Sequence, residues 1–269
     1  PIFIFNFLNF KTKLVLRISG FPRLNFFRRG LWSRFSKKIY KITCPSKDLK
    51  IQLEKQKIFT PDKIFFLPDP IINIKKFINK LNNNKNFNRK LLTKKYFISV
   101  GRLTKQKNFG YLLNEFSKFL KLNKEYQLLI FGLGEEEKSL KNQIKNLGIE
   151  NYVFLMGYTD NIYSYMKNAE AFILTSLWED PGFVIIEAAL CNLLVISSNC
   201  KNGPVEFLNN GNGGILFESN KNNALNTSLD NFLNSKSEIK NKKIIAKKNC
   251  REYTLFRHYV FFQKTILNI

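Results

Sequence analysis

Two carboxylates, Glu179 and Glu187, stand eight positions apart and bracket the turn-forming pair Pro181-Gly182. The residues before this pair predict a strand that ends near Ser176, and the apolar run after it predicts a helix from about Phe183. Glu179 would then lie at the carboxyl end of the strand, and Glu187 one to two turns into the helix. Backbone N–H groups at such a helix start face the crevice in which open α/β sheets bind anions. The spacing therefore predicts a phosphate ligand whose hydroxyl groups donate to the two carboxylates.

A second candidate site lies in the segment from Gly101 to Phe109, which directly follows a predicted strand. We expect Asn108 to be the N-cap of the next helix, and Arg102 and Lys107 flank the turn to which the helix N-terminus points. A lone basic residue is more typical of a solvated surface. Two cations at one turn, in the same half of the chain as the glutamate pair, favour a diphosphate site. Each contact to the diphosphate would contribute on the order of 1.5–3 kcal/mol.

The pair Gly132 and Gly134 follows another predicted strand and resembles part of a dinucleotide-binding fingerprint. Glu137 occupies the place of the third glycine, and the acids at 135–137 would repel a pyrophosphate. We therefore expect no NAD or FAD there and assign the two glycines to a tight turn.

The four cysteines are far apart, with no Cys-x-x-Cys pair, and the single histidine, His258, has no acidic partner at motif spacing. A zinc site or a disulfide framework is therefore not expected, and a reducing cytosol fits best. No apolar stretch approaches the roughly 18–20 residues that a membrane span needs, and no secretory signal pattern is present. The chain begins at Pro1 inside an apolar run, which suggests that its true beginning is missing.

The formal net charge of +24 has two readings. One is a drift of composition toward lysine, asparagine, isoleucine and phenylalanine, with solvated lysine faces. The other is attraction to an anionic membrane surface or to polyphosphate ligands, because a basic surface concentrates anions. Specific nucleic-acid binding is not expected, since no zinc-finger spacing, heptad basic region or RNP-type strand accompanies the charge. We expect a cytoplasmic protein that can also lie at the inner membrane face.

Short β-branched or aromatic runs alternate with helical patterns along the chain, which predicts an α/β fold with parallel sheets. The predicted strands are residues 13–18, 41–44, 63–67, 96–100, 127–131, 152–156, 171–175 and 193–198. Ser46 is a predicted N-cap for a helix over 47–56, and a basic helix is predicted over 30–40. The asparagine-rich stretch that begins at Leu81 is the predicted linker.

Several motifs together resemble the nucleotide-sugar-binding half of retaining glycosyltransferases of the GT-B fold, family 4. They are Ser99–Phe109, Gly132–Glu135, Val153–Gly157, Glu179 with Glu187 and Ala188, and Gly213–Phe217. The resemblance implies two Rossmann-like domains with parallel sheets. Residues 1–80 would be an incomplete N-terminal acceptor-side domain, 81–94 the linker, 95–250 the nucleotide-sugar-binding domain, and 251–269 a helix packing back toward the N-terminal domain.

The resemblance also implies roles for the phosphate-binding residues. Arg102 and Lys107, next to Gly101, would hold the donor's diphosphate and stabilise charge on the departing nucleoside diphosphate. No Asp-x-Asp motif is present, which agrees with chemistry that needs no metal and no cofactor. The backbone N–H groups of Gly182, Phe183 and Val184 would contact sugar hydroxyls or phosphate.

For the rest of the donor, the resemblance places Glu187 at the ribose hydroxyls and Glu179 at the transferred sugar. Tyr158 and Thr159 would line the base pocket. The family pattern has a glycine and an aromatic residue directly after the first glutamate, whereas here Asp180-Pro181 precedes Gly182. The family's glycine-rich first loop and its N-domain histidine have no counterpart.

The implied enzyme would move a sugar from a nucleotide-diphosphate donor to a glycan or lipid-linked acceptor with retention at the anomeric carbon, and this chain would be inactive alone. A GT-B-fold sugar-nucleotide epimerase would share the diphosphate site. A non-catalytic basic module that binds anionic membranes or nucleic acid is an alternative of another class, and salt-dependent binding would identify it.

Overall fold

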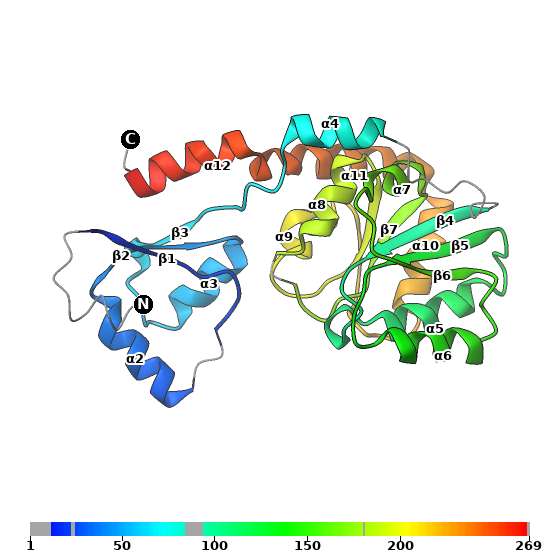
Figure 1. The fold of residues 1–269 in the computed structure, drawn as a ribbon, viewed down its shortest axis with the longest axis horizontal. Helices are drawn as coiled ribbons and strands as arrows, with labels where there is room; N and C mark the ends of the chain where they lie inside the picture. Colours follow the sequence, from blue (N-terminus) through cyan, green and yellow to red (C-terminus); the bar gives the residue numbers. More distant parts are fainter. Residues whose placement is uncertain (1–11, 23–24, 84–93, 180, 268–269) are drawn as a thin grey trace. The chain divides into compact units, whose positions relative to one another are not determined.

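The computed structural model describes residues 12–22, 25–83, 94–179 and 181–267 (Figure 1). The chain divides into two compact units. One comprises residues 1–71 together with 252–269, and the other comprises residues 72–251. The predicted linker over 81–94 lies largely outside the described residues. The helix α4 (Ile74–Asn82) includes its first two residues and belongs to the second unit.

The first unit contains a three-stranded parallel sheet in the order β1-β2-β3, as the alternation of strand and helix patterns predicts. Its elements are β1 (Leu14–Arg17), α2 (Phe26–Ser36), β2 (Ile39–Cys44), α3 (Lys47–Lys55), η1 (Pro61–Lys63), β3 (Ile64–Phe66), α12 (Leu255–Phe262) and the π-helical turn η5 (Gln263–Leu267). Ser46 caps α3 as predicted, because its hydroxyl accepts a hydrogen bond from the N–H of Leu49.

The basic helix predicted over 30–40 was wrong at both ends. Helix α2 begins at Phe26, because the side chain of Asn25 accepts a hydrogen bond from the N–H of Arg28 and caps the helix there. It ends at Ser36, and β2 begins at Ile39, three residues before the point at which β2 pairs with β3. The last segment of the chain packs on this same sheet: Phe66 contacts Phe261 edge to face at 6.0 Å, and His258 Nδ1 lies 2.6 Å from the carbonyl oxygen of Pro68.

The second unit is built on a six-stranded parallel sheet in the order β6-β5-β4-β7-β8-β9. Its strands are β4 (Lys95–Val100), β5 (Tyr126–Phe131), β6 (Val153–Gly157), β7 (Ala171–Leu174), β8 (Leu194–Ser198) and β9 (Ile215–Phe217). This is the doubly wound order in which the chain first builds outward from β4 and then returns to β7, on the other side of β4. The neighbours β4 and β7 therefore form the topological switch point, where sheets of this kind bind ligands beyond the carboxyl ends of the strands.

Helices cover both faces of this sheet (Figure 1). They are α5 (Phe109–Phe119), α6 (Glu137–Asn146), α7 (Tyr163–Asn168), α8 (Phe183–Leu190), α9 (Pro204–Phe207), α10 (Ala224–Asn234) and α11 (Lys236–Asn249), with 3₁₀ turns η3 (Lys105–Lys107) and η4 (Cys250–Tyr253). Helices α5, α6 and α10 contribute side chains to one core cluster with the sheet. Helix α8 packs against α7 and α11, and α4 packs against α7.

An aromatic cluster stabilises the face of the sheet under α5 and α10. Phe97 of β4 is fully buried and stacks on Tyr126 of β5 with ring centroids 5.1 Å apart. Phe116 and Phe119 of α5 and Phe232 of α10 contact the same ring edge to face. Truncation of a buried phenylalanine of this kind typically costs about 3–5 kcal/mol of folding stability. The cluster therefore fixes β4, which leads into one of the candidate sites.

Candidate functional site

The candidate site lies at the switch point, in the loops that follow β4 and β7. The segment from Gly101 to Asn108 leaves the carboxyl end of β4, and the segment from Thr175 to Gly182 leaves that of β7. A backbone hydrogen bond joins the two loops: the N–H of Leu177 donates to the carbonyl of Gln106 at 2.9 Å. The two sequence segments that separately predicted an anion site are thus brought together at one position in the sheet.

The strongest polar contact in these loops joins Lys107 to Glu179. Lys107 Nζ lies 2.5 Å from Glu179 Oε1, and the Ser176 hydroxyl donates to the same carboxylate oxygen at 2.5 Å. The side chain of Lys107 is 12% exposed and that of Glu179 is 5% exposed. A buried carboxylate needs an opposite charge to offset its lost hydration, and Lys107 provides that charge. An ammonium group is therefore held at the strand ends, where an incoming phosphate can bind it.

Several side chains fix the backbone on both sides of this ion pair. The hydroxyl of Thr175 donates to the carbonyl of Lys107 at 2.9 Å, and the amide of Gln106 donates to the carbonyl of Trp178 at 2.9 Å. The hydroxyl of Ser198, on β8, donates to the carbonyl of the fully buried Ser176 at 2.7 Å. These bonds hold the ion pair in one geometry.

Helix α8 begins at Phe183 as the sequence predicted, and its N-terminus follows this site. Gly182 precedes the helix in a left-handed conformation, with φ of 82°, and a Cβ at Gly182 would lie 3.3 Å from the Cγ of Glu179. The first N–H groups of a helix have no intrahelical partner, so those of Phe183 and Val184 are donors for a ligand. Gly182 thus allows the helix to start directly beside the carboxylate.

Asn108 is the N-cap residue of α5, as predicted, but it lacks the side-chain bond that usually makes such a cap. Asn108 occupies the N-cap position in a left-handed conformation (φ 54°, ψ 42°) and forms no side-chain cap bond. Its amide instead donates to the side chain of Asn220 at 3.1 Å. The reason is that η3 runs directly into α5, and the backbone must turn between them.

Arg102 lies in the same loop but is exposed, and within the described part of the chain its side chain has no hydrogen-bond or ion-pair partner. Its guanidinium is therefore available to an anion. Gly101 packs under the aliphatic part of Lys107, whose Cδ and Cε would lie 3.1 Å from a Cβ at position 101.

The Gly132–Gly134 segment crosses directly over the β4–α5 loop. A Cβ at Gly132, which has φ of 142°, would lie 1.8 Å from the carbonyl oxygen of Gly101. A Cβ at Gly134 would lie 2.3 Å from the carbonyl oxygen of Leu103. The glycines therefore permit the close approach of two loops, which explains their spacing without a dinucleotide.

Glu187 belongs to a separate cluster, in the second turn of α8. Its Oε1 accepts a hydrogen bond from the hydroxyl of Tyr163, on α7, at 3.0 Å. Burial raises the pKa of Glu187, and the Tyr163 hydrogen bond and the charge of Lys80 oppose this shift. Burial beside this carboxylate likewise raises the pKa of Tyr163. The sequence analysis placed Glu187 correctly on the helix and missed Tyr163.

The predicted base-pocket residues lie in the loop between β6 and α7. Tyr158 is 74% exposed, and the hydrogen bond to Asp160 raises the pKa of its hydroxyl. The Thr159 hydroxyl accepts a hydrogen bond from the N–H of Asn161 at 3.3 Å. The amide of Asn161 donates to the carbonyls of Lys80 and Asn83 at 2.7 Å each, and so ties this loop to the end of α4.

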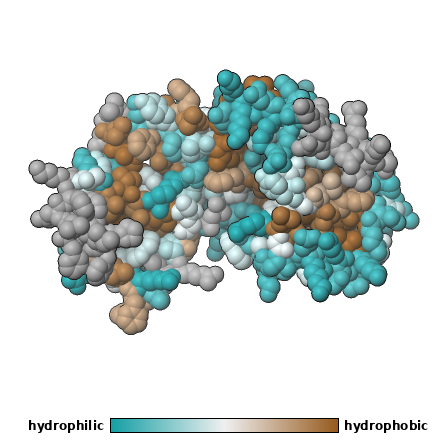
Figure 2. Space-filling model, in the orientation of Figure 1, coloured by the Kyte–Doolittle hydropathy of each residue, from teal (hydrophilic) through white to brown (hydrophobic). Residues whose placement is uncertain are grey.

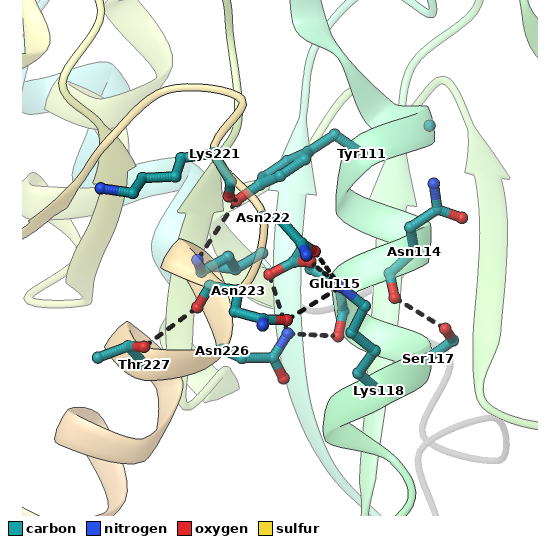
Figure 3. A network of polar contacts seen from close by, with 12 residues as sticks. Tyr111, Asn114, Glu115, Ser117, Lys118, Lys221, Asn222, Asn223, Asn226 and Thr227 are labelled. Carbon is teal, nitrogen blue, oxygen red and sulfur yellow. Dashed lines mark hydrogen bonds and ion pairs between the residues drawn. The ribbon is translucent and has the colours of Figure 1, made fainter.

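A third polar cluster has a structural explanation (Figure 3). Glu115 of α5 is almost fully buried and accepts hydrogen bonds from Lys118 at 2.6 Å and from Asn226 of α10 at 3.0 Å. Burial raises the pKa of this carboxyl, but the hydrogen bonds from Lys118, Asn226 and the N–H of Asn223 outweigh it and lower the pKa below its usual value. The cluster ties α5 to the start of α10, and its carboxylate has all its partners within the protein.

Among the described residues, no group of three or more His, Cys, Asp or Glu side chains lies close enough together to hold a metal ion. The described helices also include none that is long and apolar enough to cross a membrane.

Two α/β units with parallel sheets, one of them carrying a cationic and acidic site at its switch point, define a protein of the GT-B class. The chain belongs to the glycosyl transferases group 1 family, whose model matches residues 81–251. Its structure superposes on that of a glycosyltransferase from Rickettsia africae with a TM-score of 0.82 and 19% identity, over 100% of this chain and 74% of the other.

Two curated relatives cover most of the chain. An N-acetylgalactosamine-N,N'-diacetylbacillosaminyl-diphospho-undecaprenol 4-alpha-N-acetylgalactosaminyltransferase of Campylobacter jejuni is 28% identical over 83% of this chain. A UDP-Gal:alpha-D-GlcNAc-diphosphoundecaprenol alpha-1,3-galactosyltransferase of Escherichia coli is 30% identical over 73% of it. The chain spans 61% of the length of the first relative and 51% of the second.

Proposed function

We propose that this protein is a retaining glycosyltransferase of family 4 that transfers a hexose-type sugar from a nucleotide-diphosphate donor. The observation that carries the proposal is the position of the Lys107–Glu179 ion pair at the switch point of the six-stranded sheet. This sheet lies within the residues that match the family model. Both curated relatives are named for sugar transfer to diphospho-undecaprenol-linked glycans, which supports a glycan or lipid-linked acceptor here.

In the proposed donor complex, the diphosphate binds Lys107 and Arg102 and the N–H groups of Phe183 and Val184. Lys107 then exchanges part of its contact with Glu179 for the phosphate. Charge grows on the nucleoside diphosphate as the glycosidic bond breaks, and preorganised cations stabilise that charge. These two residues take the role that a metal ion has in other transferases.

Glu179, released in part from Lys107, accepts hydrogen bonds from hydroxyls of the transferred sugar and positions its anomeric carbon. Gly182 contributes its backbone N–H and Gly101 the space for the Lys107 side chain. Glu187 accepts hydrogen bonds from the ribose, and Tyr158 and Thr159 contact the base. Retention follows if the acceptor attacks from the face that the diphosphate leaves.

Donor binding is tested by calorimetric titration with a panel of nucleoside diphosphates and nucleotide sugars. We expect one base to be preferred, and Arg102→Ala to weaken binding of the preferred diphosphate about tenfold, a loss of about 1.4 kcal/mol. Lys138→Ala, which removes a cation elsewhere in the same unit, is the matched control. Binding that falls steeply with salt, shows no base preference and is the same in both variants would identify a basic module instead.

Because the chain alone is expected to be inactive, the chemistry is tested with the full-length protein, incubated with the preferred donor and a diphospho-undecaprenol-linked sugar. A retaining transferase gives a first-formed product with the donor's anomeric configuration, which proton NMR reads directly. Conversion of the donor's sugar to its epimer in the absence of acceptor would instead identify an epimerase.

We also propose that the protein associates with the anionic inner face of a membrane while being otherwise cytoplasmic, and that α2 makes the contact. Phe35 of this helix is buried, whereas Phe26 and Phe27 are 88% and 84% exposed. Apolar groups project beyond the end of α2 in Figure 2. Arg34 is exposed on the same helix. Exposed aromatic rings beside cations suit the interface of an anionic bilayer, and each basic residue contributes about 1 kcal/mol there.

Co-sedimentation with vesicles tests this contact. The protein should bind vesicles that contain phosphatidylglycerol better than vesicles of phosphatidylcholine alone, and replacement of both Phe26 and Phe27 by Ser should weaken binding at least tenfold. Leu122→Ser is the control, because Leu122 is 90% exposed in the other unit. Equal losses of vesicle binding in the two variants would show that α2 does not make the membrane contact.

A further inference from the structure

The side chain of Tyr163 is held by two contacts. It donates to Glu187 Oε1 at 3.0 Å, and its ring packs edge to face against Phe77 of α4, with centroids 5.1 Å apart. Within the described part of the chain, no group donates a hydrogen bond to the other carboxylate oxygen, Oε2. One oxygen of Glu187 is therefore occupied and the other is left as an acceptor.

We infer that Tyr163, held by Phe77, is a positioning residue that orients Glu187 toward the ribose hydroxyls of the donor and so sets a preference for ribonucleotides over 2′-deoxyribonucleotides. This inference rests on the proposed donor-binding role of Glu187. Tyr163 itself need not touch the nucleotide, because it acts through the carboxylate that does.

The physical reason lies in the burial of the carboxylate. Glu187 is partly buried and loses hydration, and its charged form is therefore disfavoured. The groups that face it are the Tyr163 hydroxyl from α7, the Lys80 ammonium from α4 and the Cys191 thiol from its own helix. Of these, the hydroxyl alone donates a direct hydrogen bond to it. It stabilises the ionised form and also selects one rotamer of the carboxylate.

An oriented carboxylate discriminates sharply between ribose and deoxyribose. A fixed Oε2 accepts hydrogen bonds from the ribose hydroxyls. A 2′-deoxyribose lacks one of these hydroxyls, so the partly desolvated Oε2 receives one hydrogen bond fewer. Loss of the Tyr163 hydrogen bond would let the carboxylate rotate. The discrimination should then decrease without a change in affinity for the deoxy compound.

Tyr163→Phe tests the inference, because it removes the hydroxyl and keeps the ring on Phe77. Titrations compare the preferred nucleoside diphosphate with its 2′-deoxy analogue. Tyr96→Phe is the matched control: it removes a tyrosine hydroxyl of the same unit that also donates a hydrogen bond, to the carbonyl of Tyr165 at 2.7 Å. We expect Tyr163→Phe to reduce the ribose preference by about 3- to 10-fold, the range of one hydrogen bond, and Tyr96→Phe to leave it unchanged.

A pH series gives a second readout that a merely structural role would not change. Removal of the hydroxyl removes a contact that lowers the pKa of Glu187, so the carboxylate of the variant should protonate at a higher pH. The loss of ribonucleotide affinity on acidification should shift upward in pH accordingly.

The outcomes separate the inference from its premise. If the unmodified protein shows no ribose preference, Glu187 does not bind ribose, and the proposed role fails together with the inference. If the preference exists but survives in Tyr163→Phe, or if both nucleotides weaken equally, Tyr163 does not orient Glu187 and the inference alone is overturned.

Discussion

Replacement of Lys107 by Met should affect stability and ligand binding by different routes. Lys107 Nζ is the cationic partner of Glu179, whose side chain is 5% exposed. Breaking a buried ion pair by removing one partner typically costs 3–5 kcal/mol. We expect about 3 kcal/mol here, the lower end, because Lys107 keeps 12% exposure and Ser176 still donates to the carboxylate.

The double variant Lys107→Met, Glu179→Gln should recover most of this loss. A neutral glutamine can still accept the hydrogen bond from Ser176, and no uncompensated charge remains buried. The assay is chemical denaturation, with the transition followed separately for the unit of residues 72–251, since two units need not unfold together. Stability of the single variant within about 0.5 kcal/mol of the unmodified protein, a difference typical of surface sites, would refute the reasoning.

Ligand binding should follow a different order across the same variants. Lys107→Met and the double variant should both lose nucleoside diphosphate affinity, by about tenfold or 1.4 kcal/mol. Glu179→Gln alone should retain or improve it, because the ammonium group no longer has an anionic partner within the protein. If the double variant regains both stability and affinity, Lys107 acts on the fold and not on the phosphate.

Three further predictions concern stability. Glu187→Gln should stabilise the protein at neutral pH, because burial raises the pKa of this carboxyl and disfavours its charge. The gain in stability should shrink as pH falls through the folded-state pKa of Glu187. Melting curves at several pH values would show this. Gly132→Ala should cost about 3 kcal/mol or more, because its Cβ would lie 1.8 Å from the carbonyl oxygen of Gly101, and an unchanged urea midpoint would contradict this. Lys118→Met should cost about 1–2 kcal/mol at neutral pH. Since the pKa of Glu115 is lowered in the fold, the difference between this variant and the unmodified protein should shrink as pH falls from the unfolded pKa through the lower folded-state pKa.

The alternating fold was predictable because parallel strands that are buried on both faces read as continuous apolar runs, and amphipathic helices read with a 3.6-residue period. Strand β5, for example, is buried along its whole length and was predicted within one residue. The end of α2 was not predictable in the same way. Its aromatic residues favour strand and helix alike, and pairing with neighbouring strands decided where β2 begins.

In the candidate site, the positions of Lys107, Glu179 and Glu187 after strands and on a helix could be predicted, and the structure pairs Lys107 with Glu179. Their partners were harder to find. Ser176 and Tyr163 acquire their roles from contacts between segments that adjacent residues do not specify, and hydroxyl groups are common in any sequence. Asn108 was predicted correctly as the N-cap of α5, but the turn after η3 gives it a left-handed backbone, and its side chain forms no cap bond.

Amide hydrogen exchange in the presence of the preferred nucleotide sugar tests most directly whether the switch point binds the donor. Binding there should slow exchange in the loop over 101–108 and at the start of α8, over 182–186, and Lys107→Met should abolish both effects at the same donor concentration. Slowed exchange confined to other elements, or the same protection in the variant, would contradict a donor site at the ends of β4 and β7.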